Sequence, residues 1–213
     1  MILLQNDYQE GADERVLRAL IETNAMQCPG YGDDELTAEV KDQIRTLCKA
    51  PEADVHFFTG GTQANLTVIA AALRSFEGVI SSDLGHINTH ETGAVEATGH
   101  KVLTLPHTQG KITAAQIQKA FDAHIGDVTH EHIVRPAMIY LSHPTELGTL
   151  YTRHELDAIH AVAKAYGLKL FIDGARLAYG LAAQQQVDLP YLYGVCDAFT
   201  IGGTKCGALF GEA

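Results

Sequence analysis

The chain has 213 residues, of which 46% are hydrophobic and 19% are charged. This composition is typical of a globular protein with a sizeable core and unlike that of a disordered chain. The formal net charge of −11 disfavours nucleic acid or anionic lipid as the main partner, because both are bound through basic patches. No apolar run approaches the roughly 18 residues of a membrane helix, and the start of the chain lacks the basic segment of a signal peptide.

The first predicted elements alternate between helices and short apolar strands. Residues 35–49 carry apolar side chains at spacings of three and four, after two aspartates that can cap a helix, Asp33 and Asp34. Residues 55–58 predict a strand that ends at a glycine pair, and residues 63–74 predict an alanine-rich helix. Further strands are predicted at 78–81, 101–105, 137–141, 169–172 and 197–201.

Two later helices have clear capping signals. Thr113 begins a helix predicted over 113–124. A second helix, over 152–166, opens with Thr152 and Glu155 in the spacing of a capping box and closes at a glycine. Strands that alternate with helices of this length predict an α/β fold: a three-layer sandwich with a mostly parallel sheet, without an internal domain boundary.

Ligands of such sheets bind at the carboxyl ends of the strands, so the residues that follow each strand are the candidates for function. After the strand at 55–58 comes TGGTQAN, in which Gly60 and Gly61 let backbone amides approach an anion and Thr62 adds a hydroxyl. A helix that begins there would direct its positive end at the same point, as in phosphate sites. A plain strand-to-helix turn is the alternative, because neither a Walker loop nor G-x-G-x-x-G is present.

His86 follows the next strand and is available for stacking or proton transfer. His86 and His90 are four residues apart with Glu91 adjacent, so a metal pair is an alternative. No third ligand with its own spacing is evident, and no metal is predicted. The segment SHPTELGT at 142–149 either lines a ligand or forms a turn around its proline.

Two charged residues stand at the last two strand ends. Asp173 ends the strand at 169–172 and is followed three residues later by Arg176. Lys205 lies in the glycine-rich, otherwise apolar segment GGTKCGALFG, beside Thr204. Such a lysine is either solvated at the surface or desolvated, and desolvation lowers the pKa of the amine and makes it a nucleophile.

Pyridoxal phosphate would use a phosphate cup, an imidazole, a strand-end carboxylate and a lysine together. Its phosphate suits a helix N-terminus, its ring nitrogen needs a carboxylate, and its aldehyde needs a lysine. The strand-end residues therefore predict a pyridoxal 5′-phosphate site, with Asp173 as the partner of the ring nitrogen.

At these residues the sequence resembles the fold-type I pyridoxal-phosphate enzymes, and more closely the low-specificity threonine aldolases of the β-eliminating lyase family. The shared segments cover nearly the whole chain in family order: NDY at 6–8, PGYGDDELT at 29–37, TGGTQAN, GHINTHETG at 85–93, SHPTELGTLY, FIDGARL and GGTKCGALFGEA. The resemblance implies the large domain of the aspartate-aminotransferase-like fold over residues 1–213, with an N-terminal segment. Family members continue into a small C-terminal domain, which this chain is expected to lack.

The resemblance also implies roles for single residues. Lys205 would form the Schiff base with the cofactor, and Asp173 would pair with the ring nitrogen. His86 would stack on the ring and take part in proton transfer, and Arg176 would lie near the cofactor and the substrate carboxylate. Thr204 is implied to contact the cofactor.

Three further implications concern the phosphate and the substrate. Gly61 and Thr62, with Gly60, would hold the phosphate. Asn6 matches a polar position on the substrate side, and Tyr31 belongs to a tyrosine-glycine motif that is often reached across a dimer interface.

The implied activity is cleavage of threonine or allo-threonine to glycine and acetaldehyde, in a homodimer or homotetramer. The four cysteines are spread without a C-x-x-C pair, which makes a reducing cytoplasm the expected location. Two alternatives stay open: β-elimination from another amino acid, and an inactive large-domain fragment. Cys206 stands where relatives often have asparagine; it is either a reactive thiol, because Lys205 is adjacent, or an inert one.

Overall fold

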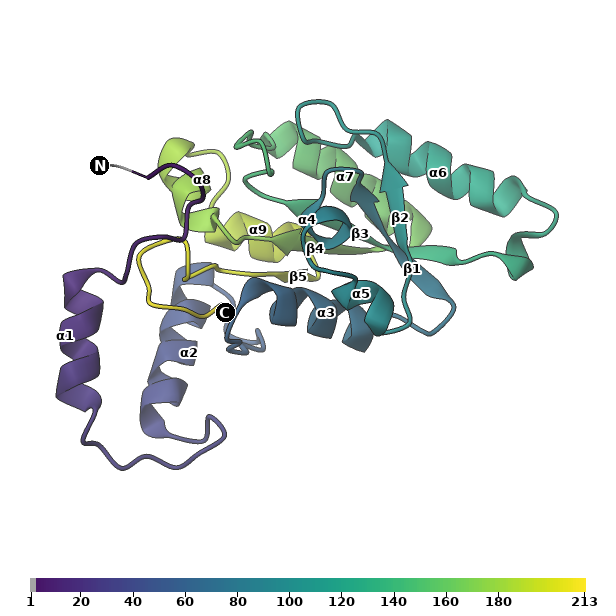
Figure 1. Ribbon diagram of the computed structural model, residues 1–213. Coiled ribbons are helices and arrows are strands. Elements are labelled where there is room, and N and C mark those ends of the chain that lie inside the picture. The colour runs from purple at the N-terminus through teal and green to yellow at the C-terminus, as the bar shows by residue number, and fades with distance from the viewer. Residues whose placement is uncertain (1–2) are drawn as a thin grey trace.

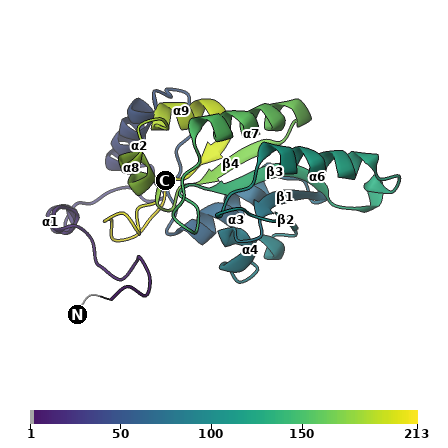
Figure 2. The same cartoon turned by 90° about the horizontal axis from the view of Figure 1, so that it is seen from above.

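The fold is a parallel sheet between two layers of helices, seen in a computed structural model that describes residues 3–213 (Figures 1 and 2). The strands lie in the order β2-β1-β3-β4-β5, and every pairing is parallel. Their bounds are β1 (Glu77–Ser82), β2 (Val102–Leu105), β3 (Arg135–Ser142), β4 (Lys169–Asp173) and β5 (Ala198–Phe199).

Helices α6, α7 and α9 cover one face of the sheet, and α3, α4 and α5 cover the other (Figures 1 and 2). The helices are α1 (Glu14–Thr23), α2 (Glu35–Cys48), α3 (Gly61–Ala72), α4 (His86–Thr89), α5 (Ala94–Ala97), α6 (Ala114–Gly126), α7 (Arg153–Tyr166), α8 (Leu177–Ala183) and α9 (Leu189–Val195), with a 3-10 turn η1 (His130–His132). The predicted three-layer α/β sandwich is confirmed.

Alternating side chains of the central strands supply both cores. Ile139 and Leu141 of β3 pack under α6, α7 and α9, whereas Met138 and Tyr140 pack against α3, α4 and α5. Phe171 joins the second core, while its neighbours in β4 join the first. Successive residues of a strand point to opposite faces, so both faces of the buried strands are apolar, as expected when helices cover the sheet on both sides.

The helix caps agree with the sequence. Thr113 and Thr152 are N-caps with complete capping boxes, and the glycine after α7 ends that helix in the left-handed region. Of the two candidate aspartates before α2, Asp34 is the cap, and its side chain accepts a hydrogen bond from the Thr37 backbone. These caps satisfy backbone amides that a helix start leaves unpaired.

The prediction of a strand at 55–58 was wrong. The segment is extended, but only Phe58 pairs, through an isolated antiparallel bridge to Glu212. Among residues 3–213 no strand lies along the rest of it to complete a ladder. The strand predicted over 197–201 is shorter in the structure, where β5 covers Ala198–Phe199. The short helices α4, α5, α8 and α9, together with α1, were not predicted.

Helix α1 stands apart from the sheet, joined to α2 by a long connection (Figure 1). No residue of α1 is buried. No helix within residues 3–213 is both long and apolar enough to cross a membrane.

Candidate active site

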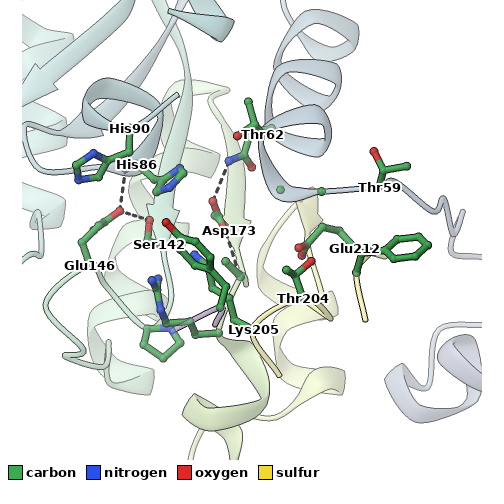
Figure 3. A pocket seen from close by; sticks show the side chains of 18 residues that line it. Thr59, Thr62, His86, His90, Ser142, Glu146, Asp173, Thr204, Lys205 and Glu212 are labelled. Carbon is green, nitrogen blue, oxygen red and sulfur yellow. Dashed lines mark hydrogen bonds between the residues drawn. The ribbon is translucent and has the colours of Figure 1, made fainter. Parts of the chain in front are cut away.

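A cavity of about 390 Å³ opens at the carboxyl ends of β3 and β4 (Figure 3). The residues predicted to bind the cofactor all line it: Gly60, Gly61, Thr62, His86, Asp173, Arg176, Thr204 and Lys205. They come from four separate segments of the chain, and the parallel topology brings these segments to one edge of the sheet. Their individual roles remain predictions.

Asp173 ends β4 and is 5% exposed. Its Oδ2 accepts hydrogen bonds from Asn65 Nδ2 at 2.9 Å and from the Tyr140 hydroxyl at 2.5 Å. Its Oδ1 accepts one from the Ala175 backbone amide at 2.9 Å. Three donors from three elements therefore fix the orientation of this carboxylate, and burial raises the pKa of Tyr140, which keeps that hydroxyl a donor.

The glycine after Asp173 explains how the strand ends at the cavity. A Cβ on Gly174 would lie 1.9 Å from the Thr200 carbonyl oxygen, so only glycine permits this approach. The Gly174 backbone amide also donates a hydrogen bond to the Thr200 hydroxyl at 2.8 Å. Because the segments after β4 and β5 touch here, Asp173 and the turn that carries Lys205 line the same cavity.

A second chain of contacts joins Asp173 to the imidazole. Asn65 Nδ2 also donates to Glu91 Oε1 at 2.7 Å, and His86 Nδ1 lies 2.8 Å from the same oxygen. The Glu91 side chain is fully buried. Because Glu91 accepts from Nδ1, the neutral imidazole of His86 has its free electron pair on Nε2.

The start of α3 has the features of an anion site. No side chain caps this helix, and its first-turn amides lie at the wall of the cavity beside Gly60, Gly61 and Thr62. A Cβ on Gly60 would meet nothing within 4 Å, and one on Gly61 would meet only Glu212 Oε1 at 4.0 Å. Open space in front of unpaired amides at a positive helix end suits a phosphate.

Lys205 is half-buried in the turn after β5, with its Nζ 5.8 Å from the centre of the Tyr8 ring. Arg176 pairs with Asp7 through both its Nε and its Nη2. This ion pair lowers the pKa of Asp7 against the opposing effect of burial. It ties the N-terminal segment to the cavity and brings Tyr8 into its wall.

Two residues predicted on the substrate side lie elsewhere in this chain. Asn6 is exposed, and its side chain accepts a hydrogen bond from the Tyr8 backbone instead of lining the cavity. Tyr31 is also fully exposed, between α1 and α2, with a positive φ of 66°. Burial raises the pKa of the Cys206 thiol, which disfavours the reactive thiolate form.

The sequence did not single out five residues of the site, which are Tyr8, Asn65, Tyr140, Glu146 and Glu212. Asn65 could have been found, because it lies four residues after Gly61 and therefore on the same side of α3. Glu146 accepts hydrogen bonds from the His86 backbone at 2.8 Å and from Ser142 Oγ at 2.5 Å. For the alternative of a metal pair, the ring centres of His86 and His90 lie 5.7 Å apart in an edge-to-face arrangement. Within residues 3–213 no group of three histidine, cysteine, aspartate or glutamate side chains could hold a metal ion.

The residues present fit pyridoxal phosphate at each of its three functional ends. The uncapped start of α3 suits the phosphate, the buried Asp173 suits the ring nitrogen, and Lys205 supplies an amine for the aldehyde. All three line one cavity, which is the arrangement that the strand ends predicted.

Comparisons with known proteins show which proteins the chain is similar to. The chain is 35% identical to a low specificity L-threonine aldolase of Pseudomonas aeruginosa over 98% of its length, and it covers 60% of that protein. It is 35% identical to another, from a Pseudomonas species, over 86% of its length, and covers 52% of it. A solved threonine aldolase of Leishmania major superposes with a TM-score of 0.92 at 46% identity, over 97% of this chain and 60% of that one.

The chain thus spans between 52% and 60% of the length of these relatives. Their similarity confirms the fold-type I architecture and the resemblance to threonine aldolases. The family model described as beta-eliminating lyase matches residues 14–209. The chain belongs to the beta-eliminating lyase family.

Proposed function

We propose that residues 1–213 form the cofactor-binding domain of a pyridoxal-phosphate-dependent lyase that cleaves threonine or allo-threonine to glycine and acetaldehyde. The observation that carries this proposal is the shared cavity: Asp173, Lys205 and the open start of α3 line one space. The names of the most similar relatives, which are threonine aldolases, support the choice of substrate.

When bound, pyridoxal phosphate draws the electron pair of a breaking bond at Cα into its ring. The start of α3 would bind its phosphate, and Asp173 would hold a proton at its ring nitrogen. Asn65 and Tyr140 keep the Asp173 carboxylate aimed into the cavity through their hydrogen bonds. Lys205 supplies the amine that anchors the aldehyde.

His86 is placed to move the proton that a retro-aldol cleavage must remove from the β-hydroxyl. Its Nδ1 is held by Glu91, so Nε2 is the atom that accepts the proton, either directly or through a water. Arg176 binds the substrate carboxylate, since its guanidinium lies at the cavity and Asp7 fixes its plane. Cys206 and Glu146 need no part in this cleavage.

The first test is acetaldehyde release from threonine by the wild type and by Asp173→Ala. Loss of the ring-nitrogen partner should reduce turnover by at least about 100-fold, the scale seen when a pre-organised electrostatic group is removed. The matched control is Asp83→Ala, which removes an exposed carboxylate that pairs with His107 outside the cavity. Near-wild-type turnover by Asp173→Ala would exclude the role of this residue.

The alternative of β-elimination is tested in parallel with a β-substituted amino acid. Pyruvate release without acetaldehyde release from threonine would show that the chain eliminates a leaving group and does not break a carbon–carbon bond. A colourless, folded and inactive protein would favour the inactive-fragment alternative.

We also propose that the chain works in the cytoplasm as a homodimer or homotetramer. All four cysteines are free. Helix α1 exposes Leu17, Leu20 and Ile21, and Tyr31 is fully exposed nearby in the chain. A second copy that packs on α1 would cover these side chains. Light scattering that shows only monomers at high concentration would contradict this proposal.

A further inference from the structure

Glu212 is a buried acid of the cavity that the proposed reaction does not use. The residue is 6% exposed, and its Oε2 has no hydrogen-bond partner within residues 3–213. Its backbone exchanges two hydrogen bonds of 2.9 Å with Phe58, which fixes it beside the glycine turn that precedes α3. A buried polar atom without a partner destabilises the fold, so a ligand that pairs with Oε2 would remove this cost.

The Glu212 carboxyl group points at the predicted phosphate position. Its Oε1 lies 4.0 Å from the point that a Cβ on Gly61 would occupy. In Figure 3 the carboxyl lies between the start of α3 and Thr204, across the cavity from His86 and Glu146. Any anion held by the first-turn amides of α3 would therefore meet the Glu212 carboxyl.

The charges around Glu212 decide whether its protonated or its ionised carboxyl contacts the anion. Burial and the negative charge of Asp173 together raise the pKa of Glu212 to about 7, against the opposing effect of Lys205. Thr204 and the positive end of α3 also face the group and favour the ionised form. A bound phosphate would add negative charge at the start of α3, and two anions in contact without a donor would repel each other.

We propose that Glu212 is a further ligand of the cofactor phosphate, to which its protonated carboxyl donates a hydrogen bond. The inference rests on the proposed function, because it places the phosphate at the start of α3. The carboxyl proton is shared between Glu212 and the phosphate, and no bond other than hydrogen bonds is formed. The affinity for the cofactor then depends on pH through this one proton.

The test measures the dissociation constant of pyridoxal phosphate for the wild type and for Glu212→Gln, from about pH 6.5 to about pH 8.5. Glutamine keeps an N–H donor that does not titrate in this range. We expect the dissociation constant of the wild type to rise by about tenfold more than that of the variant across this window, as loss of one bound proton requires. Pyridoxal, which has no phosphate, should show no such difference.

Glu96→Gln is the matched control, because it makes the same chemical change at an exposed residue of α5 that does not line the cavity. Its pH profile should follow that of the wild type. Parallel profiles for wild type and Glu212→Gln, or an equal difference with pyridoxal, would overturn the inference and leave the proposed function standing. Failure of the wild type to bind pyridoxal phosphate at any pH would overturn both.

Phosphorus NMR of the cofactor bound to the wild type gives a readout that needs no variant protein. If the phosphate shares a proton with Glu212, its chemical shift should change with pH across the same window. A constant shift would mean that the phosphate binds as the dianion without this donor, and the inference would fall.

Discussion

Asn65 is the residue whose replacement tests the buried network most sharply. It is 1% exposed, and its Nδ2 donates to Asp173 Oδ2 at 2.9 Å and to Glu91 Oε1 at 2.7 Å. Leucine has a similar volume but no donor. The substitution Asn65→Leu therefore removes one donor from each of two buried carboxylates while preserving the packing of α3 on the sheet.

The expected cost follows from the number and kind of bonds lost. A hydrogen bond to a charged group contributes about 1.5–3 kcal/mol, so two such bonds contribute about 3–6 kcal/mol. Folded domains are stable by about 5–15 kcal/mol in total. We expect the free energy of unfolding to fall by about 3–6 kcal/mol, which is a large part of the stability of the protein.

The assay is urea unfolding followed by far-ultraviolet circular dichroism, with Asn88→Leu as the control. Asn88 is exposed and donates one hydrogen bond, to the Asp83 carbonyl oxygen. Its loss should cost less than about 1 kcal/mol. If Asn65→Leu also costs less than about 1 kcal/mol, the two carboxylates do not depend on this amide, and the reasoning is refuted.

Two further predictions use a glycine and a buried histidine. Gly61→Ala should keep or raise the melting temperature, because the added Cβ has room and alanine favours helix. The dissociation constant of pyridoxal phosphate should rise by at least about tenfold, which is about 1.4 kcal/mol of binding free energy. An unchanged dissociation constant would contradict the phosphate site. Burial lowers the pKa of His143 from 6.5 to about 4, so between these pH values the unfolded chain binds a proton that the folded chain does not. The free energy of unfolding should therefore fall by up to about 3 kcal/mol as the pH drops through this window, and urea unfolding of His143→Gln should show a smaller loss; equal losses would assign the acid sensitivity to other groups.

Local patterns were enough to predict the layers of the fold and one edge of the site. Caps such as Thr113 and Thr152 act within four residues, and the apolar runs of β3 and β4 are recognisable because helices bury them on both sides. The strand-end rule then placed Asp173 and Lys205 at the same edge without knowledge of their distance.

Features that depend on distant contacts were not predictable in this way. Residues 55–58 look like a strand but pair only at Phe58, because strand formation needs a neighbour and not only β-forming residues. Tyr140 alternates into the face of α3, where its hydroxyl reaches Asp173, 33 residues away in sequence. Glu212 becomes a member of the cavity through its bridges to Phe58 and Gly202, which are distant in sequence or irregular in structure.

The central claim is that Lys205 and Asp173 hold one pyridoxal phosphate between them. Incubation of the protein with the cofactor, reduction with borohydride and peptide mapping by mass spectrometry test it most directly. The account predicts a pyridoxyl adduct on Lys205 in the wild type, and a weaker one in Asp173→Ala. An adduct only on other lysines, or none on a folded protein, would contradict it.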